Sequence, residues 1–292
     1  MKFKQLALIG CGLMGGSFAL ALRRANAVER IVGYSKSPLT TERACKLGVI
    51  DVAAESALMA VSGADLVLVA VPVSATEQTL KNIHPLIEPH MLVMDVGSTK
   101  RDVVDIARRV LKDKAPSFVP AHPIAGKELS GIQHADGALF DGRQVILTPL
   151  PQTNPDMLAR AGDVWRAVGA HVIQMSAEEH DAAFAAVSHL PHLLAFAYFS
   201  AVVGQPGGRE FLALAGPGFR DFTRIAASDP QLWRDVLLAN REEVLKQLAR
   251  FRHTLDAMEH VMRSANGAAL EDLIRQPATQ RAQWQMQTGS QS

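Results

Sequence analysis

The sequence of residues 6–17 is LALIGCGLMGGS, and this stretch decides the fold class of the chain. Four apolar residues precede glycines at positions 10, 12 and 15, and the residues that follow favour a helix. This is the G-x-G-x-x-G spacing of a strand-to-helix turn that binds a dinucleotide. The first glycine permits the bend, the second lets the backbone approach a pyrophosphate, and the third lets helix and strand pack closely. The helix N-terminus offers N–H groups to the phosphates; the alternative is a glycine-rich turn without a ligand.

The charge balance of the chain limits its partners. Among 292 residues, 30 are Lys or Arg and 29 are Asp or Glu, which gives a formal net charge of +1. This balance gives no electrostatic reason to expect nucleic acid or an anionic membrane as a partner. Cys11 and Cys45 are too few for a disulfide framework,, and the N-terminal apolar segment is too short for a secretory signal. We therefore expect a cytoplasmic protein.

Apolar segments alternate with segments of helical pattern as far as residue 175. The unbroken run ADLVLVAVP at residues 64–72 is typical of a parallel strand with both faces buried,. Strands that alternate with helices predict βαβ units, and thus an α/β fold with a Rossmann-type doubly wound parallel sheet. The strands that we expect after the first are residues 30–34, 47–51, 64–72, 91–96, 118–121, 144–148 and 171–175.

The end of the second predicted strand indicates which dinucleotide binds. An acidic residue there binds the ribose 2′-hydroxyl of NAD, whereas small polar and basic residues accommodate the 2′-phosphate of NADP. Ser35, Lys36 and Ser37 occupy this place and favour NADP. The alternative is that NAD binds without the usual carboxylate and that Lys36 is a solvated turn residue. The cofactor-binding residues that we expect are Gly10, Gly12, Leu13, Met14, Gly15, Ser35, Lys36, Val71 and Pro72.

The pattern changes at Ser176, after which no strand is predicted. Residues 182–204 are nearly uncharged and long enough to cross a bilayer. His189, Pro191 and His192 interrupt them, and an S-x-x-E capping box precedes them,. We therefore expect no membrane partner, but an all-α domain with this helix buried in its core or in a subunit interface.

A narrow apolar seam follows further along the chain. From Val244 to Met262, apolar residues recur at alternating spacings of four and three, which favours helix pairing and a homodimer. The polar tail is expected to be disordered. We divide the chain into a dinucleotide-binding domain (1–175), a helical substrate and dimerisation domain (176–276) and a disordered tail (277–292).

Two candidate catalytic residues follow predicted strands, where open α/β sheets bind ligands. His122 and Ser98 both stand at such carboxyl ends, beside the expected cofactor. An imidazole there can accept a proton from a substrate hydroxyl as hydride leaves the same carbon. The alternative for His122 is a structural histidine that bonds to backbone.

Two further groups can bind a substrate. His189 and His192 share one helix face, and no nearby Cys or carboxylate completes a metal set with them,. We expect no metal, one of these histidines in the core, and the other in a pocket. Arg220 and Arg224 are candidate anion binders because a guanidinium binds carboxylate bidentately; the alternative is a solvated helix face with Asp221 as partner.

Several stretches, in this order, resemble the prephenate/arogenate (cyclohexadienyl) dehydrogenase family of tyrosine biosynthesis. The glycine turn is shared with many dehydrogenases, whereas the stretches that begin with HPIAG and DFTR are specific. The matching stretches span most of the chain: GCGLMGGS at 10–17, DVGSTK at 95–100, HPIAGKELSG at 122–131, SHLPH at 188–192, DFTRIA at 221–226 and SDP at 228–230.

The resemblance implies a reaction and roles for these residues. Hydride leaves the hydroxyl-bearing ring carbon of a cyclohexadiene for the nicotinamide, and carbon dioxide leaves the opposite carbon, so that the ring becomes aromatic. His122 would polarise the ring hydroxyl with help from Ser98, and the helical domain would form the dimer. The strand end at Ser35 departs from the Asp of many members. The substrate-binding residues implied are His192, Arg224 as the carboxylate anchor, and Glu128 and Asp221 beside Arg224 at the entrance.

Two other functions are consistent with a nucleotide-binding fold. A β-hydroxyacid-type NAD(P) dehydrogenase usually needs a lysine on its helical domain, and residues 176–204 contain histidines but no lysine. A non-catalytic nucleotide sensor would bind the cofactor and be indifferent to replacement of His122. No residue decides between prephenate and arogenate as substrate.

Overall fold

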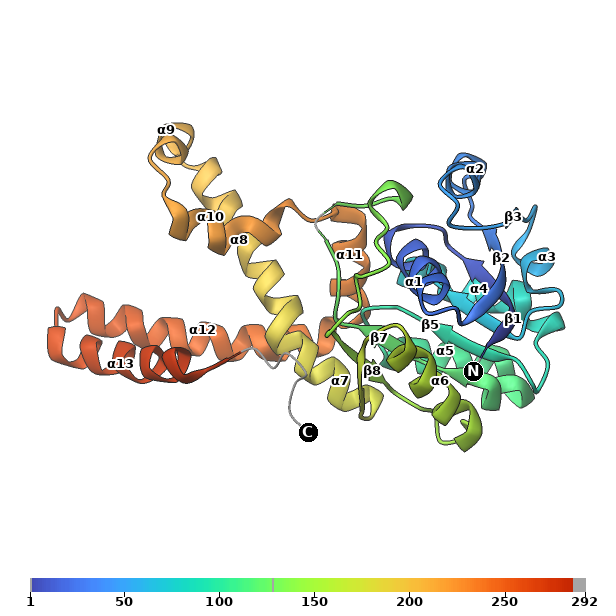
Figure 1. Cartoon of the computed structure of the whole chain (residues 1–292). Coiled ribbons are helices and arrows are strands. Elements are labelled where there is room, and N and C mark those ends of the chain that lie inside the picture. The colour runs from blue at the N-terminus through green and yellow to red at the C-terminus, as the bar shows by residue number, and fades with distance from the viewer. Residues whose placement is uncertain (1, 128, 286–292) are drawn as a thin grey trace.

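The computed structural model of the chain describes residues 2–127 and 129–285 (Figure 1). The N-terminal part is a layered α/β structure, and the part after strand β9 is helical. Helices α8, α12 and α13 project away from the α/β part (Figure 1). The predicted fold class is confirmed.

The centre of the N-terminal part is a parallel six-stranded sheet in the order β3-β2-β1-β4-β5-β6. In its middle, Leu6 of β1 pairs with Ile31 on one side and Leu66 on the other. Strand order reverses between β1 and β4, and such a point is where doubly wound sheets bind ligands. The strands are β1 (Phe3–Ile9), β2 (Val28–Tyr34), β3 (Val52–Ala53), β4 (Leu66–Val69), β5 (Leu92–Asp95) and β6 (Phe118–Val119).

Alternate side chains of each strand pack into two hydrophobic clusters, one on each face of the sheet. Leu6 and Leu8 join Phe18 of α1 and Trp165 of α6, whereas Ile9 joins residues of α3, α4 and α5. Because helices cover both faces, the strands are apolar at nearly every position. The helices are α1 (Leu13–Arg24), α2 (Pro38–Lys46), α3 (Ala57–Val61), α4 (Thr76–Ile83), α5 (Arg101–Leu111) and α6 (Pro155–Ala167).

Three details of the predicted sheet are wrong. Residues 47–51 are not a strand, and the third strand, β3, begins only at Val52. Gly48 forms a turn with φ +69°, and the Asp51 carboxylate accepts the Ile31 N–H at 2.7 Å. Residues 118–121 form two strands, since Pro120 has no N–H to donate and separates β6 from β7,. The last strands form a separate mixed sheet, in which β8 pairs antiparallel with β7 and parallel with β9: β7 (Ala121–Pro123), β8 (Gln144–Leu147) and β9 (His171–Gln174).

The helical part begins at the predicted capping box. The Ser176 hydroxyl accepts the Glu179 N–H, and the Glu179 carboxylate accepts the Ser176 N–H. Helix α7 (Ala177–Phe184) continues through a π-helical turn (Ala185–His189) into α8 (Leu190–Gly204). The π-helical turn ends two residues before Pro191, whose missing N–H interrupts the α-helical ladder,.

The remaining helices correct the prediction for the tail. Residues 277–283 are helical rather than disordered, because α13 continues through Pro277 and packs along α12 as an antiparallel pair (Figure 1). The predicted tail residues 286–292 lie outside the described residues. The helices are α9 (Gly208–Ala213), α10 (Pro217–Thr223), α11 (Pro230–Ala239), α12 (Arg241–Arg263) and α13 (Gly267–Gln283).

The apolar stretch 182–204 is helical as predicted, but a single chain leaves most of it uncovered. The helix Ala177–Gly204 has the length and hydropathy of a membrane span, with 17% of its most apolar window buried. Val187, Tyr198 and Val203 are 72%, 46% and 41% exposed. The core of a single chain therefore does not bury this helix, and an apolar surface of this kind marks an interaction site.

Candidate active site

A cavity of about 550 Å³ opens where the strands end and the helical part begins. The turn after β1 and the ends of β4, β5 and β7 line it from one side, and α8, α11 and the segment between α10 and α11 line it from the other. Nine predicted site residues line this cavity: Gly12, Leu13, Met14, Val71, Pro72, Ser98, His122, His192 and Arg224.

The glycine turn has the geometry that a pyrophosphate requires. Gly10 has φ +101°, and a Cβ there would lie 2.1 Å from the Ala70 carbonyl oxygen. A Cβ on Gly15 would lie 2.2 Å from the Gly10 carbonyl oxygen. A Cβ on Gly12 would meet no atom within 4 Å, and Gly12 lines the cavity. Two glycines are therefore needed to build the turn, and the third leaves the N-terminus of α1 open to phosphate.

Ser35 and Lys36 lie at the end of β2, outside the residues that line the cavity. The Ser35 hydroxyl accepts the Cys11 N–H at 2.8 Å and so helps to hold the glycine turn. Lys36 is exposed. Burial raises the pKa of the Cys11 thiol to about 11, so the thiol stays neutral.

His122 presents a neutral imidazole to the cavity. It lies on β7, and its Nδ1 is 2.8 Å from Nε2 of His180. Burial, followed by the neighbouring His180, Lys100 and His189, holds the pKa of His122 well below its ordinary value. Since Nδ1 faces His180, Nε2 is the nitrogen left for the cavity. A neutral ring in this place can accept a hydrogen bond from a substrate hydroxyl and take its proton as the hydroxyl-bearing carbon is oxidised.

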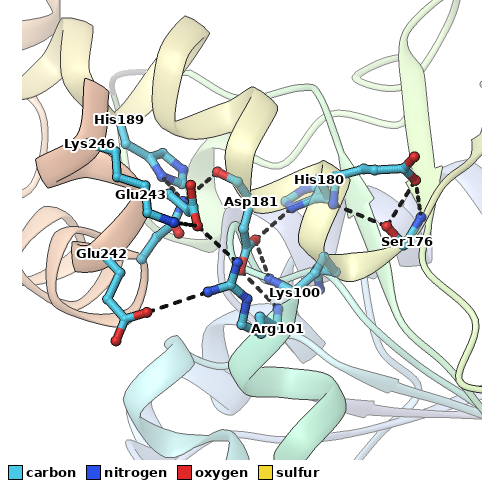
Figure 2. Close-up of polar contacts among 11 residues, drawn as sticks. Lys100, Arg101, Ser176, His180, Asp181, His189, Glu242, Glu243 and Lys246 are labelled. Carbon is cyan, nitrogen blue, oxygen red and sulfur yellow. Dashed lines mark hydrogen bonds and ion pairs between the residues drawn. The ribbon is translucent and has the colours of Figure 1, made fainter. Parts of the chain in front are cut away.

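The partner of His122 leads to a buried carboxylate (Figure 2). Nδ1 of His180 is 2.8 Å from Oδ1 of Asp181, and Asp181 also accepts the backbone N–H groups of Lys100 and Arg101 at 2.9 and 3.0 Å. Burial opposes ionisation of Asp181, but the bonds from His180 and the two N–H groups hold its pKa below the ordinary value. Sequence reasoning missed this pair, although an adjacent His and Asp directly before the nearly uncharged stretch 182–204 were a visible signal,.

A buried ion pair supports the backbone on both sides of Ser98. Nζ of Lys100 lies 2.5 Å from Oδ2 of Asp95, and the side chains are 0% and 3% exposed. The same carboxylate accepts the Gly97 N–H at 2.8 Å and the Ala121 N–H at 3.0 Å. The pair therefore holds the segments that carry Ser98 and His122.

The two histidines of the predicted H-x-x-H pair have different surroundings. His192 lines the cavity and stacks on Trp233 with ring centroids 3.5 Å apart. His189 is buried, and its Nδ1 lies 3.1 Å from the Asn240 amide nitrogen. Burial lowers the pKa of His189 to about 4. Trp233, which sequence reasoning missed, also lines the cavity.

The predicted anion-binding residues are divided between the cavity and the surface. Arg224 lines the cavity. Asp221 does not line it, and its carboxylate accepts a bond from Nε of Arg220 at 3.1 Å on the exposed surface. Glu128, the remaining predicted residue, lies outside the described residues, and its neighbours Lys127 and Leu129 line the cavity.

Comparison with known proteins identifies the family. Two family models match consecutive parts of the chain: the nucleotide-binding domain of prephenate dehydrogenase over residues 18–174 and its dimerization domain over residues 176–276. The chain belongs to the prephenate dehydrogenase family. The resemblance noted in the sequence is thereby confirmed, and the family's enzymes are NAD(P)-dependent oxidoreductases.

Relatives match most of the length of the chain. The chain is 35% identical over 269 residues to a cyclohexadienyl dehydrogenase of Zymomonas mobilis, covering 91% of this chain and 90% of that protein. It is 38% identical over 257 residues to a Bacillus subtilis prephenate dehydrogenase, covering 86% and 68%. The crystal structure of Aquifex aeolicus prephenate dehydrogenase with hydroxyphenyl propionate and NAD+ is 34% identical, with a TM-score of 0.91 and coverage of 97% and 98%.

Proposed function

We propose that this chain catalyses the oxidative decarboxylation of prephenate or arogenate in tyrosine biosynthesis. The product is 4-hydroxyphenylpyruvate or tyrosine, and the hydride acceptor is a nicotinamide cofactor. One observation carries the proposal: the open glycine turn, the neutral His122 and Arg224 line a single cavity. Membership of the prephenate dehydrogenase family supports it.

His122 acts on the ring hydroxyl of the substrate. Its neutral Nε2 accepts the hydroxyl proton as the carbon that bears the hydroxyl is oxidised. Ser98, which lines the same cavity, places a second hydroxyl near this oxygen. When bound, the nicotinamide ring supplies the hydride acceptor. Loss of carbon dioxide then makes the ring aromatic, and the proton returns from His122 to the phenol oxygen.

Arg224 anchors a substrate carboxylate. A guanidinium forms two parallel bonds to a carboxylate, and such charge-assisted bonds are strong. His192, held flat against Trp233, contacts the substrate from the helical side. The family resemblance gives Glu128 and Asp221 a role beside Arg224 at the entrance. In the single chain, the Asp221 carboxylate accepts a bond from Arg220.

The cofactor preference is NADP. The residues present fit a dinucleotide at the glycine turn, where Gly12 leaves room for phosphate and Val71 and Pro72 line the same cavity. Ser35 and the exposed Lys36 stand at the end of β2 where a 2′-phosphate would lie,. A lysine favours that phosphate, whereas the ribose of NAD needs no positive charge.

The active form is a homodimer in the cytoplasm. The matched C-terminal domain is a dimerization domain, and α8 exposes an apolar surface that includes Val187, Tyr198 and Val203. Burial of apolar surface is the main driving force for association. The free Cys11 and Cys45 suit a reducing compartment.

A four-way assay tests the function. Purified chain is incubated with prephenate or arogenate, each with NAD or NADP, and reduced cofactor is followed by its absorbance. We expect turnover with at least one substrate, and faster turnover with NADP at equal concentration. The absence of turnover in all four combinations would overturn the proposed function.

A further inference from the structure

His122 faces the cavity on one side and a buried histidine–carboxylate pair on the other. Figure 2 shows this pair, His180 and Asp181. We propose that His180 and Asp181 are a closed proton store, which fixes the tautomer of His122 and takes up its Nδ1 proton while the substrate proton occupies Nε2. This inference rests on the proposed function and concerns how the site handles one proton.

The contacts of Asp181 determine where each proton lies. An ionised carboxylate only accepts hydrogen bonds, so Nδ1 of His180 donates to Oδ1 of Asp181 across 2.8 Å. Nε2 of a neutral His180 is then an acceptor, and Nδ1 of His122 must donate to it across 2.8 Å. His122 is therefore left with an unprotonated Nε2. Asp181 thus sets the basic nitrogen of His122 through one intermediate ring.

The pair is shielded from solvent. His180 and Asp181 are 0% and 1% exposed. Phe184 covers both histidines, with its ring centroid 4.5 Å from that of His180 and 4.8 Å from that of His122. The ring of His180 therefore does not touch bulk water, and His122 is the neighbour that connects it to the substrate cavity.

A closed store suits the stoichiometry of this reaction. When the substrate C–H bond breaks, its electron pair leaves as hydride, the O–H proton moves to Nε2 of His122, and the Nδ1 proton moves to Nε2 of His180. His122 stays neutral and His180 carries the positive charge. When the carboxylate leaves as carbon dioxide, its bonding pair completes the aromatic ring, and both protons move back to leave a phenol. No net proton is released, so no exit path is needed.

The charges around His180 permit this transient cation. Asp181 is its direct counterion. The other titratable groups near the two rings are Lys100 and Asp95, which neutralise each other at 2.5 Å, and His189, which is neutral. Burial lowers the pKa of His180, and the bond to Asp181 acts in the opposite direction.

Two substitutions of His180 distinguish its role in fixing the tautomer of His122 from its role in taking up a proton. In His180→Gln the amide oxygen can still accept from His122 Nδ1 but cannot take up a proton, whereas in His180→Phe both functions are lost. We expect single-turnover rates to fall about tenfold in His180→Gln and on the order of a hundredfold in His180→Phe, the usual worth of a positioned proton acceptor. The KM for substrate should change by less than about threefold in both variants, because His180 does not line the cavity.

The decisive readout is a proton inventory, in which single-turnover rates are measured in mixtures of H2O and D2O. Wild type should give a curved plot, because two protons move together, and His180→Gln a straight one. Glu179→Gln, the neighbour of His180 in the capping box, is the matched control and should keep the curved plot. A straight plot for wild type, or wild-type rates in His180→Gln, would overturn the store.

A second measurement needs no variant. Nitrogen-15 NMR of the histidine-labelled wild-type enzyme should show the Nδ1–H tautomer for both His122 and His180, and an Nε2–H tautomer of either would overturn the inference. Different results would contradict the proposed function and the proton store. Wild type without turnover contradicts the function, whereas an active wild type with a straight inventory contradicts the store alone.

Discussion

Replacement of Lys100 by Met removes one half of the buried ion pair behind the site. Lys100 and Asp95 have side chains that are 0% and 3% exposed, and their charged atoms lie 2.5 Å apart. Loss of one partner of such a pair leaves an unpaired buried charge and costs about 3–5 kcal/mol. Asp95 keeps the N–H groups of Gly97 and Ala121, which soften this cost, so we expect a loss near the lower limit.

Urea unfolding, followed by circular dichroism, measures this loss as a change in the free energy of unfolding. The control is Lys81→Met, which removes an exposed pair with Glu77 and should cost less than about 1 kcal/mol. Asp95→Asn combined with Lys100→Met should recover part of the loss, because no unpaired charge then remains. A loss for Lys100→Met no larger than that of Lys81→Met would refute the reasoning.

The same variant also tests the electrostatics of the base. Lys100 contributes to the lowered pKa of His122 after burial and His180, so its removal raises that pKa. A base loses activity when it is protonated at low pH. The acid limb of the kcat/KM profile should therefore move to higher pH in Lys100→Met, and an unmoved or downward-shifted limb would show that His122 is not the group that titrates.

Three further substitutions test single roles at the site. His122→Asn should lower kcat by about a hundredfold or more in steady-state assays, and a near-normal rate would remove His122 from the chemistry. Arg224→Ala should raise the KM for substrate by about tenfold or more, because it removes a charge-assisted bond worth roughly 1.5–3 kcal/mol; a constant KM would mean that the carboxylate is bound elsewhere. Lys36→Ala should raise the KM for NADP about tenfold and leave that for NAD unchanged, and equal effects on both cofactors would contradict the proposed preference.

The parts of the fold that could be predicted are those coded by local patterns. The glycine turn and the apolar run of β4 determine a buried parallel sheet because each pattern is satisfied within a few residues. The split at Pro120 was locally coded too, by the missing N–H. The extent of α13 was not, because a polar helix is stabilised by its packing on α12, and the polar composition after Gln276 is equally typical of disorder.

Among the site residues, too, some could be predicted from a local pattern and others are brought to the site only by packing. His122 was found because it follows a strand directly, and strand ends converge at one edge of the sheet. His180 lies 58 residues further along the chain, and only the packing of α7 against the α/β part brings it to His122. The sequence shows a His and an Asp at adjacent positions but not the backbone N–H groups that fix the Asp charge.

The N–H groups of Lys100 and Arg101 also join the helical part to the α/β part, next to the residues that fix the tautomer of His122. Asp181 of α7 binds the N–H groups of Lys100 and Arg101 at the start of α5, and the Arg101 side chain lies 3.1 Å from Glu243 of α12 (Figure 2). A rotation of the helical part that opens the cavity would therefore pull Asp181 away from these donors. The carboxylate would lose bonds that keep it ionised, and with them its hold on the tautomer of His122 through His180. The contacts that join the two parts therefore include the ones that hold Asp181, and through it His180, beside His122.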